Sequence, residues 1–189
     1  MNVDQFLIDT LVAEIYKRID GGGEIFLIGN GGSAANAHHI AGDFSKTFAM
    51  LGKSLKINCL SDNACFLTAA ANDIDYSEVY EILIDTRIKK NDFIILFSGS
   101  GNSMNLIKVA RKANNPKIKV AALLGYTGGA LKKIVDIPIH YEVADMEIAE
   151  DCQIIIFHFI KQKIIEMIDI NSDYNSQKYQ KRTNQDLIA

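Results

Sequence analysis

Apolar residues recur along this chain at two different spacings, one typical of helices and one typical of strands. Residues 2–20 repeat apolar positions at helical spacing and run into Gly21, Gly22 and Gly23, as a helix with a glycine stop does. Short apolar runs further along predict strands. The expected strands cover residues 24–28, 54–60, 92–97, 118–124 and 134–141.

Helix-compatible sequence separates these strands, and the alternation predicts an α/β fold: a three-layer sandwich in which a five-stranded parallel sheet carries helices on both faces. Ligands of such sheets bind beyond the carboxyl ends of the strands. Two of the expected helices cover residues 106–113 and 147–167. The apolar face of the second is expected to comprise Ile148, Cys152, Ile155, Ile156, Phe159, Ile160 and Ile164. Residues 1–170 are expected to form one domain and 171–189 a polar tail.

Composition and charge narrow the classes of function. The chain has 189 residues, 48% of them hydrophobic, and a net charge of −3, which gives no general attraction to nucleic acid or anionic membranes. We expect neither as a partner, no membrane span and no signal peptide, and hence a cytoplasmic protein. Cys59, Cys65 and Cys152 lack disulfide or metal-binding spacing and are expected to be buried, reduced thiols.

The first segment with chemical potential is a glycine turn between a strand and a helix. Gly29, Gly31 and Gly32 allow the backbone to turn tightly and approach a ligand, and Ser33 adds a hydroxyl group. The helix that follows directs unpaired N–H groups and its positive dipole end at this turn. The order of elements therefore predicts an anion site.

A second serine- and glycine-rich loop follows the strand expected at 92–97. Ser98, Ser100 and Ser103 could donate hydrogen bonds to a small anion, although such residues often only cap the next helix. Two such turns at neighbouring strand ends favour a phosphate site. Neither turn has the spacing of a nucleotide-binding loop, so a small sugar phosphate fits better than a nucleotide.

At this point the chain resembles a known family. Gly29-Asn30-Gly31-Gly32-Ser33, His39, the Asn72-Asp73 pair, the Ser98–Ser103 loop and His158 together resemble the sugar isomerase (SIS) domain, and within it the phosphoheptose isomerases. The resemblance extends from about residue 12 to residue 168 and implies a flavodoxin-like topology. It also implies conversion of sedoheptulose 7-phosphate to D-glycero-D-manno-heptose 7-phosphate, for lipopolysaccharide or capsule synthesis.

The resemblance assigns the candidate side chains to three groups. The expected phosphate ligands are Ser33, Ser98, Ser100 and Ser103, and the residues expected around the rest of the substrate are Asn30, Gly31, Asn72, Asp73 and Glu150. The expected metal ligands, for one zinc ion per subunit, are His39, Asp43, Glu150 and His158. Helical spacing agrees with this, because His39 and Asp43 are four residues apart and share one face.

Asp43 and His158 are the expected base and acid of the proton transfer. The family usually has glutamate at Asp43 and glutamine at Glu150, so the chain departs from the pattern at both positions. A shorter carboxylate at Asp43 leaves two alternatives open: an isomerase for another sugar phosphate, and a SIS module that binds a sugar phosphate or a protein without catalysis.

The assembly is expected to be a homotetramer. Long apolar helices at both ends of a short domain carry more hydrophobic surface than one face of a sheet can cover. The resemblance further implies sites built between subunits, with His158 completing a neighbour's pocket.

Overall fold

The computed structural model describes residues 3–114 and 118–168, and the tail expected at 171–189 lies outside these ranges. Its helices are α1 (Gln5–Tyr16), α2 (Gly31–Met50), α3 (Ala64–Asp73), α4 (Glu81–Arg87), α5 (Met104–Asn114), the short 3-10 helix η1 (Leu131–Lys133) and α6 (Met146–Met167). Its strands are β1 (Glu24–Gly29), β2 (Lys56–Cys59), β3 (Phe93–Ser98), β4 (Lys119–Leu124) and β5 (Ile137–His140).

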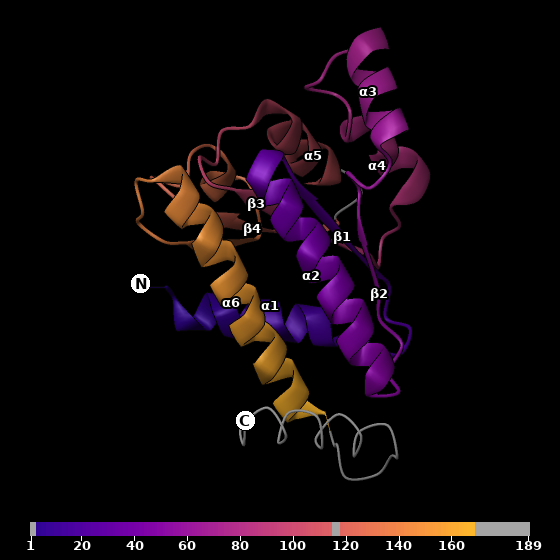
Figure 1. Ribbon diagram of the computed structural model, residues 1–189, viewed down its shortest axis with the longest axis vertical. Helices are drawn as coiled ribbons and strands as arrows, with labels where there is room; N and C mark the ends of the chain where they lie inside the picture. The colour runs from indigo at the N-terminus through magenta and orange to yellow at the C-terminus, as the bar shows by residue number, and fades with distance from the viewer. Residues whose placement is uncertain (1–2, 115–117, 169–189) are drawn as a thin grey trace, which may run out of the picture.

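The five strands form one parallel sheet in the order β2-β1-β3-β4-β5 (Figure 1). This confirms the expected α/β sandwich, and the order is the flavodoxin-like one. The order reverses between β1 and β3, which pair directly from Ile25↔Phe93 to Gly29↔Phe97. The two glycine- and serine-rich loops follow these two strands and therefore begin side by side at the carboxyl edge of the sheet.

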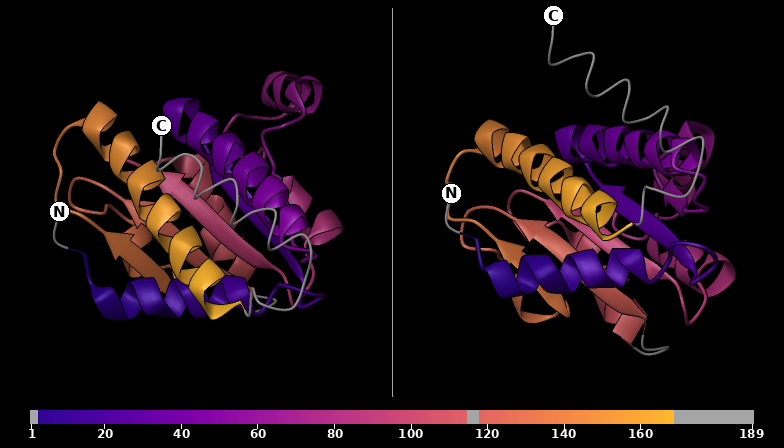
Figure 2. Two further views of the ribbon diagram at one scale, coloured as in Figure 1. Left: turned by 60° about the horizontal axis from the view of Figure 1, so that its bottom comes forward. Right: turned by 90° about the horizontal axis from the view of Figure 1, so that it is seen from below.

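Alternation along the strands divides the core into two layers. In β3, Phe93, Ile95 and Phe97 point to one face of the sheet, and Ile94 and Leu96 point to the other. Helices α1, α2 and α6 cover the first face, as Figure 2 shows, and α4 and α5 cover the second. Because both faces are covered, the central strands are almost continuously apolar.

Helix α6 corrects one expectation about its buried face. Ile148, Ile155 and Phe159 are 53%, 59% and 43% exposed, whereas Gln153 and Phe157 on the same helix are fully buried. The helix is apolar on more than one side, so periodicity could not decide which side meets the sheet. The inner side is the one that packs against α2 and β3.

The cysteines divide in a similar way. Cys59 and Cys152 are buried as expected, but the expectation for Cys65 is wrong, because it lies exposed on α3. That helix projects from the body of the molecule (Figure 1), and Ala70 is its buried residue. Within the described ranges, no helix has both the length and the apolar character that a membrane crossing requires.

The packing of Phe157 gives a prediction about stability. Its ring lies 5.1 Å from that of Phe97 in β3 and 5.8 Å from that of Phe44 in α2, measured between centroids. Phe157→Ala should lower the free energy of unfolding by about 3–5 kcal/mol, because it leaves a cavity between α2, α6 and the sheet. Urea unfolding followed by circular dichroism measures this. The control is Phe6→Ala in α1, where the side chain is 76% exposed and the expected loss is below about 1 kcal/mol. Equal losses for the two variants would contradict the assigned packing.

Candidate active site between the phosphate loops and the α2–α6 seam

The two loops line one small cavity at the carboxyl edge of the sheet. Its volume is about 210 Å³, and α6 contributes Met146 and Glu150 to its wall. Six residues expected to bind substrate line it as well: Asn30, Gly31, Ser33, Ser98, Ser100 and Ser103. A larger hollow of about 500 Å³ opens at the opposite edge, near Arg18 and Lys56, and contains none of these groups.

Backbone geometry explains why the first loop needs glycine. Gly31 begins α2 with a φ of +53°, in the left-handed region that side chains disfavour. At Gly32, an added Cβ would collide with the carboxylate of Glu150. Gly31 therefore allows the turn itself, and the absence of a side chain at Gly32 allows Glu150 of α6 to approach the first turn of α2.

Two serine hydroxyls of the second loop are already oriented. Ser98 Oγ accepts a hydrogen bond from the Gly101 N–H at 3.0 Å, and Ser100 Oγ accepts one from the Asn102 N–H at 3.2 Å. Because each oxygen accepts a bond from its own loop, each hydroxyl proton is left to donate elsewhere. An anion in the cavity is a suitable acceptor.

Asn30 lines the cavity, but its side chain is used within the protein. Its amide exchanges two hydrogen bonds of 2.9 Å with the amide of Asn105, and Tyr76 Oη donates a third, at 2.8 Å, to Asn30 Oδ1. This network fixes the loop after β1 against the start of α5. Asn30 therefore acts as a support for the loop in this structure.

Glu150 is placed at the amino end of α2 and not with the histidines. Ser33 Oγ donates to Glu150 Oε1 at 3.3 Å, and the buried Gln153 donates to Ser33 Oγ at 3.1 Å. A carboxylate thus lies at the helix end where the dipole favours a negative charge. The fully buried Gln153 was missed in the sequence, and its only signal there was a polar residue among the apolar positions of α6.

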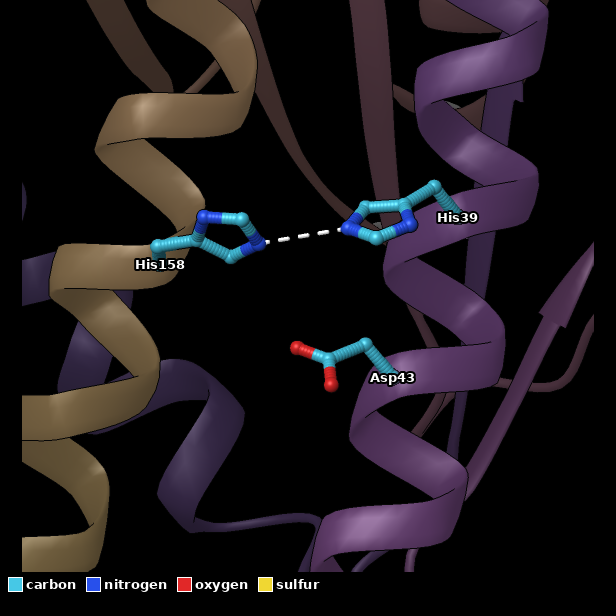
Figure 3. Close-up of side chains that lie close together, drawn as sticks. All are labelled: His39, Asp43 and His158. Atoms are coloured by element: carbon cyan, nitrogen blue, oxygen red, sulfur yellow. Dashed lines mark hydrogen bonds between the residues drawn. The ribbon is translucent and has the colours of Figure 1, made fainter. Parts of the chain in front are cut away.

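Three of the four expected metal ligands come together further along the same two helices. His39 Nε2 and His158 Nε2 are 3.2 Å apart, and one ligand atom each from His39, Asp43 and His158 lie within 4.8 Å of one another. Figure 3 shows the two rings meeting across the gap between α2 and α6, with the Asp43 carboxylate beside them. His158 therefore joins the cluster of its own chain.

Burial and neighbouring charges shift the pKa values of two groups in this cluster. Burial raises the pKa of Asp43, but hydrogen bonds and positive charge from Lys161 and Lys46 outweigh it and hold that pKa below its ordinary value. Burial lowers the pKa of His158, and the charge of Lys161 lowers it further against the opposing effect of Asp43. Near neutral pH, an ionised carboxylate thus lies beside an uncharged imidazole, a base next to a group that can exchange protons.

Asn72 and Asp73 are not brought to the cavity. They lie exposed at the end of α3, where Asn72 Nδ2 donates to Asp73 Oδ1 at 2.8 Å. The structure therefore assembles the loop residues, Glu150 and the His39–Asp43–His158 cluster in one chain and leaves this pair outside.

Comparisons with known proteins agree with this architecture. A family model described as "SIS domain" matches residues 5–125. The chain is 32% identical over 146 residues to a phosphoheptose isomerase of Helicobacter pylori (strain Shi470), covering 77% of this chain and 76% of that protein. It is 33% identical over 164 residues to a phosphoheptose isomerase of Chlorobaculum parvum, covering 84% and 76%. The structure of a phosphoheptose isomerase from Francisella tularensis superposes with a TM-score of 0.79 over 85% of each chain at 23% identity, a likeness of fold.

The carboxylate in the loop cavity gives a prediction about anion binding. Glu150→Gln should bind inorganic phosphate about tenfold more tightly than the unmodified protein, because it removes a negative charge from the same small cavity. Isothermal titration calorimetry at constant ionic strength measures the change. Asp151→Asn is the matched control, since this neighbouring carboxylate is exposed and should leave the affinity within about twofold. Equal effects of the two substitutions would contradict the assigned position of the anion.

Proposed function

Because the chain belongs to the SIS domain family, we propose that it is a sugar-phosphate aldose–ketose isomerase that converts sedoheptulose 7-phosphate to D-glycero-D-manno-heptose 7-phosphate. One observation carries the proposal: a cavity lined by two serine–glycine loops lies in line with a cluster of two histidines and an aspartate on the same pair of helices. The first can hold a phosphate group, and the second can move protons at the other end of the substrate. The product is a heptose phosphate of the kind used in lipopolysaccharide or capsule synthesis, and we place the reaction in the cytoplasm, where phosphorylated sugars are metabolised.

The phosphate end uses neutral donors and a helix terminus. We assign Ser98, Ser100 and Ser103 to the phosphate oxygens, together with Ser33 once its hydroxyl exchanges its bond to Glu150 for one to the phosphate, and the first turn of α2 supplies backbone N–H groups and its dipole. Each hydroxyl bonded to a charged acceptor contributes about 1.5–3 kcal/mol. Glu150 shares this cavity and is assigned to the part of the substrate next to the phosphate.

The distance between the two ends favours a long sugar. Ser33 and His39 are six positions apart on α2, and Glu150 and His158 are eight positions apart on α6, which correspond to about 9 Å and 12 Å along a helix. A three- or four-carbon sugar phosphate is too short for its carbonyl to reach the histidines from the loop cavity. A seven-carbon chain has the required length.

The isomerisation moves two protons and leaves the overall composition unchanged. We assign Asp43 to take the proton from C1 of the ketose and return it to C2, so that an enediol forms and collapses. His158 is assigned to take the O1 proton at Nδ1 and deliver it to O2, since its Nε2 faces His39 in the candidate metal cluster. In the metal-free chain both pKa values are lowered, so that near neutral pH the carboxylate is ionised and the imidazole is uncharged.

The cluster fits a zinc ion in the chemistry and spacing of its donors. Two ligand atoms on one tetrahedral zinc ion lie about 3.3 Å apart, and the two histidine nitrogens are 3.2 Å apart. His39, Asp43 and His158 would hold the ion, one per chain, with Glu150 placed elsewhere. When bound there, the ion would polarise the substrate carbonyl as a Lewis acid.

We also propose a homotetramer whose contacts use α6 and α3. Ile148, Ile155 and Phe159 are spaced by seven and four residues, so they form one exposed apolar stripe along α6. A second copy of the chain is the assigned occupant of this stripe. Asn72 and Asp73, exposed on the projecting α3, are assigned to the substrate pocket of a neighbouring subunit (Figure 1).

The metal and acid–base assignment is tested at His158. His158→Ala should lose bound zinc by elemental analysis and should lower turnover of sedoheptulose 7-phosphate at least about 10²-fold, since proton transfer and metal binding both need the ring. His38→Ala is the control: this neighbour of His39 is exposed, contacts Ser61 Oγ at 2.9 Å, and should keep metal and activity. Full activity of the His158 variant would contradict the role. Substrate binding without turnover in the unmodified protein would identify a non-catalytic module instead.

The assembly is tested at the centre of the stripe. Ile155→Asp should convert the tetramer to smaller species at micromolar concentration, because it places a charge in an apolar contact. Light scattering coupled to size-exclusion chromatography measures the mass. Ile134→Asp provides the comparison, because Ile134 is 36% exposed next to η1, away from the stripe, and should leave the mass unchanged. A monomeric unmodified protein would rule out this assembly.

A further inference from the structure

Lys161 lies one helical turn beyond His158 on α6 and contacts the cluster directly. Its ammonium group pairs with Asp43 Oδ2 across the seam between α6 and α2. Both side chains are largely enclosed, with 16% of Lys161 and 13% of Asp43 exposed. The Lys161–Asp43 pair therefore lies parallel to the His158–His39 pair, one turn along the same two helices.

A second lysine near Asp43 has a different environment. Lys46 lies three residues further along α2 and approaches the other carboxylate oxygen, Oδ1, at 3.3 Å. Its side chain is 56% exposed, so solvent and salt screen its charge and little is gained from the contact. Lys161 makes its contact inside the helix seam, where screening is weaker.

An ammonium group and a divalent metal ion compete for the same carboxylate. Each draws on the lone pairs of the Asp43 carboxylate, one oxygen of which Lys161 already engages, and an ammonium group left beside a metal ion repels it at short range. The ring nitrogens of His39 and His158 are close enough to share an ion, but the third donor is already engaged. Separating Asp43 from Lys161 therefore costs free energy, and this cost weakens metal binding.

We propose that Lys161 is a built-in counter-cation of Asp43, which a divalent metal ion must displace before it can use that carboxylate as a ligand. The inference rests on the proposed function only for the choice of zinc as the ion. Lys161 is a positioning residue in this role: it holds the Asp43 carboxylate in the seam toward the histidines while no metal is bound. Metal affinity is consequently set by Lys161 as well as by the three ligands.

The experiment measures metal affinity without substrate. Zn²⁺ and Co²⁺ are titrated into the full-length metal-free protein in competition with a chromophoric chelator, and the Co²⁺ absorption bands report whether the carboxylate is a ligand. Lys161→Met keeps the length of the side chain and removes its charge, and it should bind either ion at least about tenfold more tightly than the unmodified protein. Lys161→Arg keeps the charge and should remain within about threefold.

The matched control removes the exposed lysine. Lys46→Met should change the affinity by less than about threefold, because its contact is screened. Urea unfolding checks that each variant is folded. If Lys161→Met does not fold, Lys161→Arg still tests the proposal, because it keeps the charge. Metal binding by Lys161→Arg well above that of the unmodified protein would count against a role of the charge. Unchanged or weaker metal binding by folded Lys161→Met, or equal effects of Lys161→Met and Lys46→Met, would overturn the proposal.

The outcome separates this inference from the proposed function. Tighter metal binding by Lys161→Met, with no turnover of sedoheptulose 7-phosphate in any variant, would support the counter-cation and contradict the isomerase. Turnover by the unmodified protein, together with equal metal affinities of the unmodified protein and Lys161→Met, would support the isomerase and contradict the counter-cation.

Discussion

The contact between α2 and α6 is the interaction on which the candidate site depends. The two helices lie side by side on one face of the sheet, and Phe157 packs from α6 against both α2 and β3. That apolar contact sets the spacing of the two helices. A line of polar pairs follows the contact between α2 and α6, from Ser33 and Gln153 to His39 and His158. Because each pair joins residues more than a hundred positions apart, each depends on the tertiary packing of these helices and none on local structure.

The seam also explains how opposite charges are arranged along the site. Glu150 lies at the amino end of α2, where the dipole favours an anion, and Lys161 lies against Asp43, where the donors favour a cation. The protein's own side chains therefore neutralise both ends when no ligand is present. The Asp43 and Lys161 side chains are largely enclosed, and an uncompensated charge between packed helices is costly. A ligand at either end has to compete with a side chain of the protein.

The sheet contributes the position of the loops. Since β1 and β3 are neighbours where the strand order reverses, the two loops open into the same space above the carboxyl edge. Their own hydrogen bonds then orient them, as when Ser98 accepts from Gly101 and Asn30 exchanges bonds with Asn105. Rigid loops suit a phosphate site, because the donors are in place before the ligand arrives.

The order of elements, the two loops and the pairing of His39 with Asp43 could be predicted from the chain alone, because strand alternation, glycine turns and four-residue spacing are local properties. Four features could not be predicted in this way. They are the exposed side of α6, the exposed Cys65, the position of Glu150 away from the histidines and the contact of Lys161 with Asp43. Spacing along a helix decides which side chains share a face. It does not decide which other helix that face meets or at which turn, because packing against the sheet and the crossing of distant helices set both.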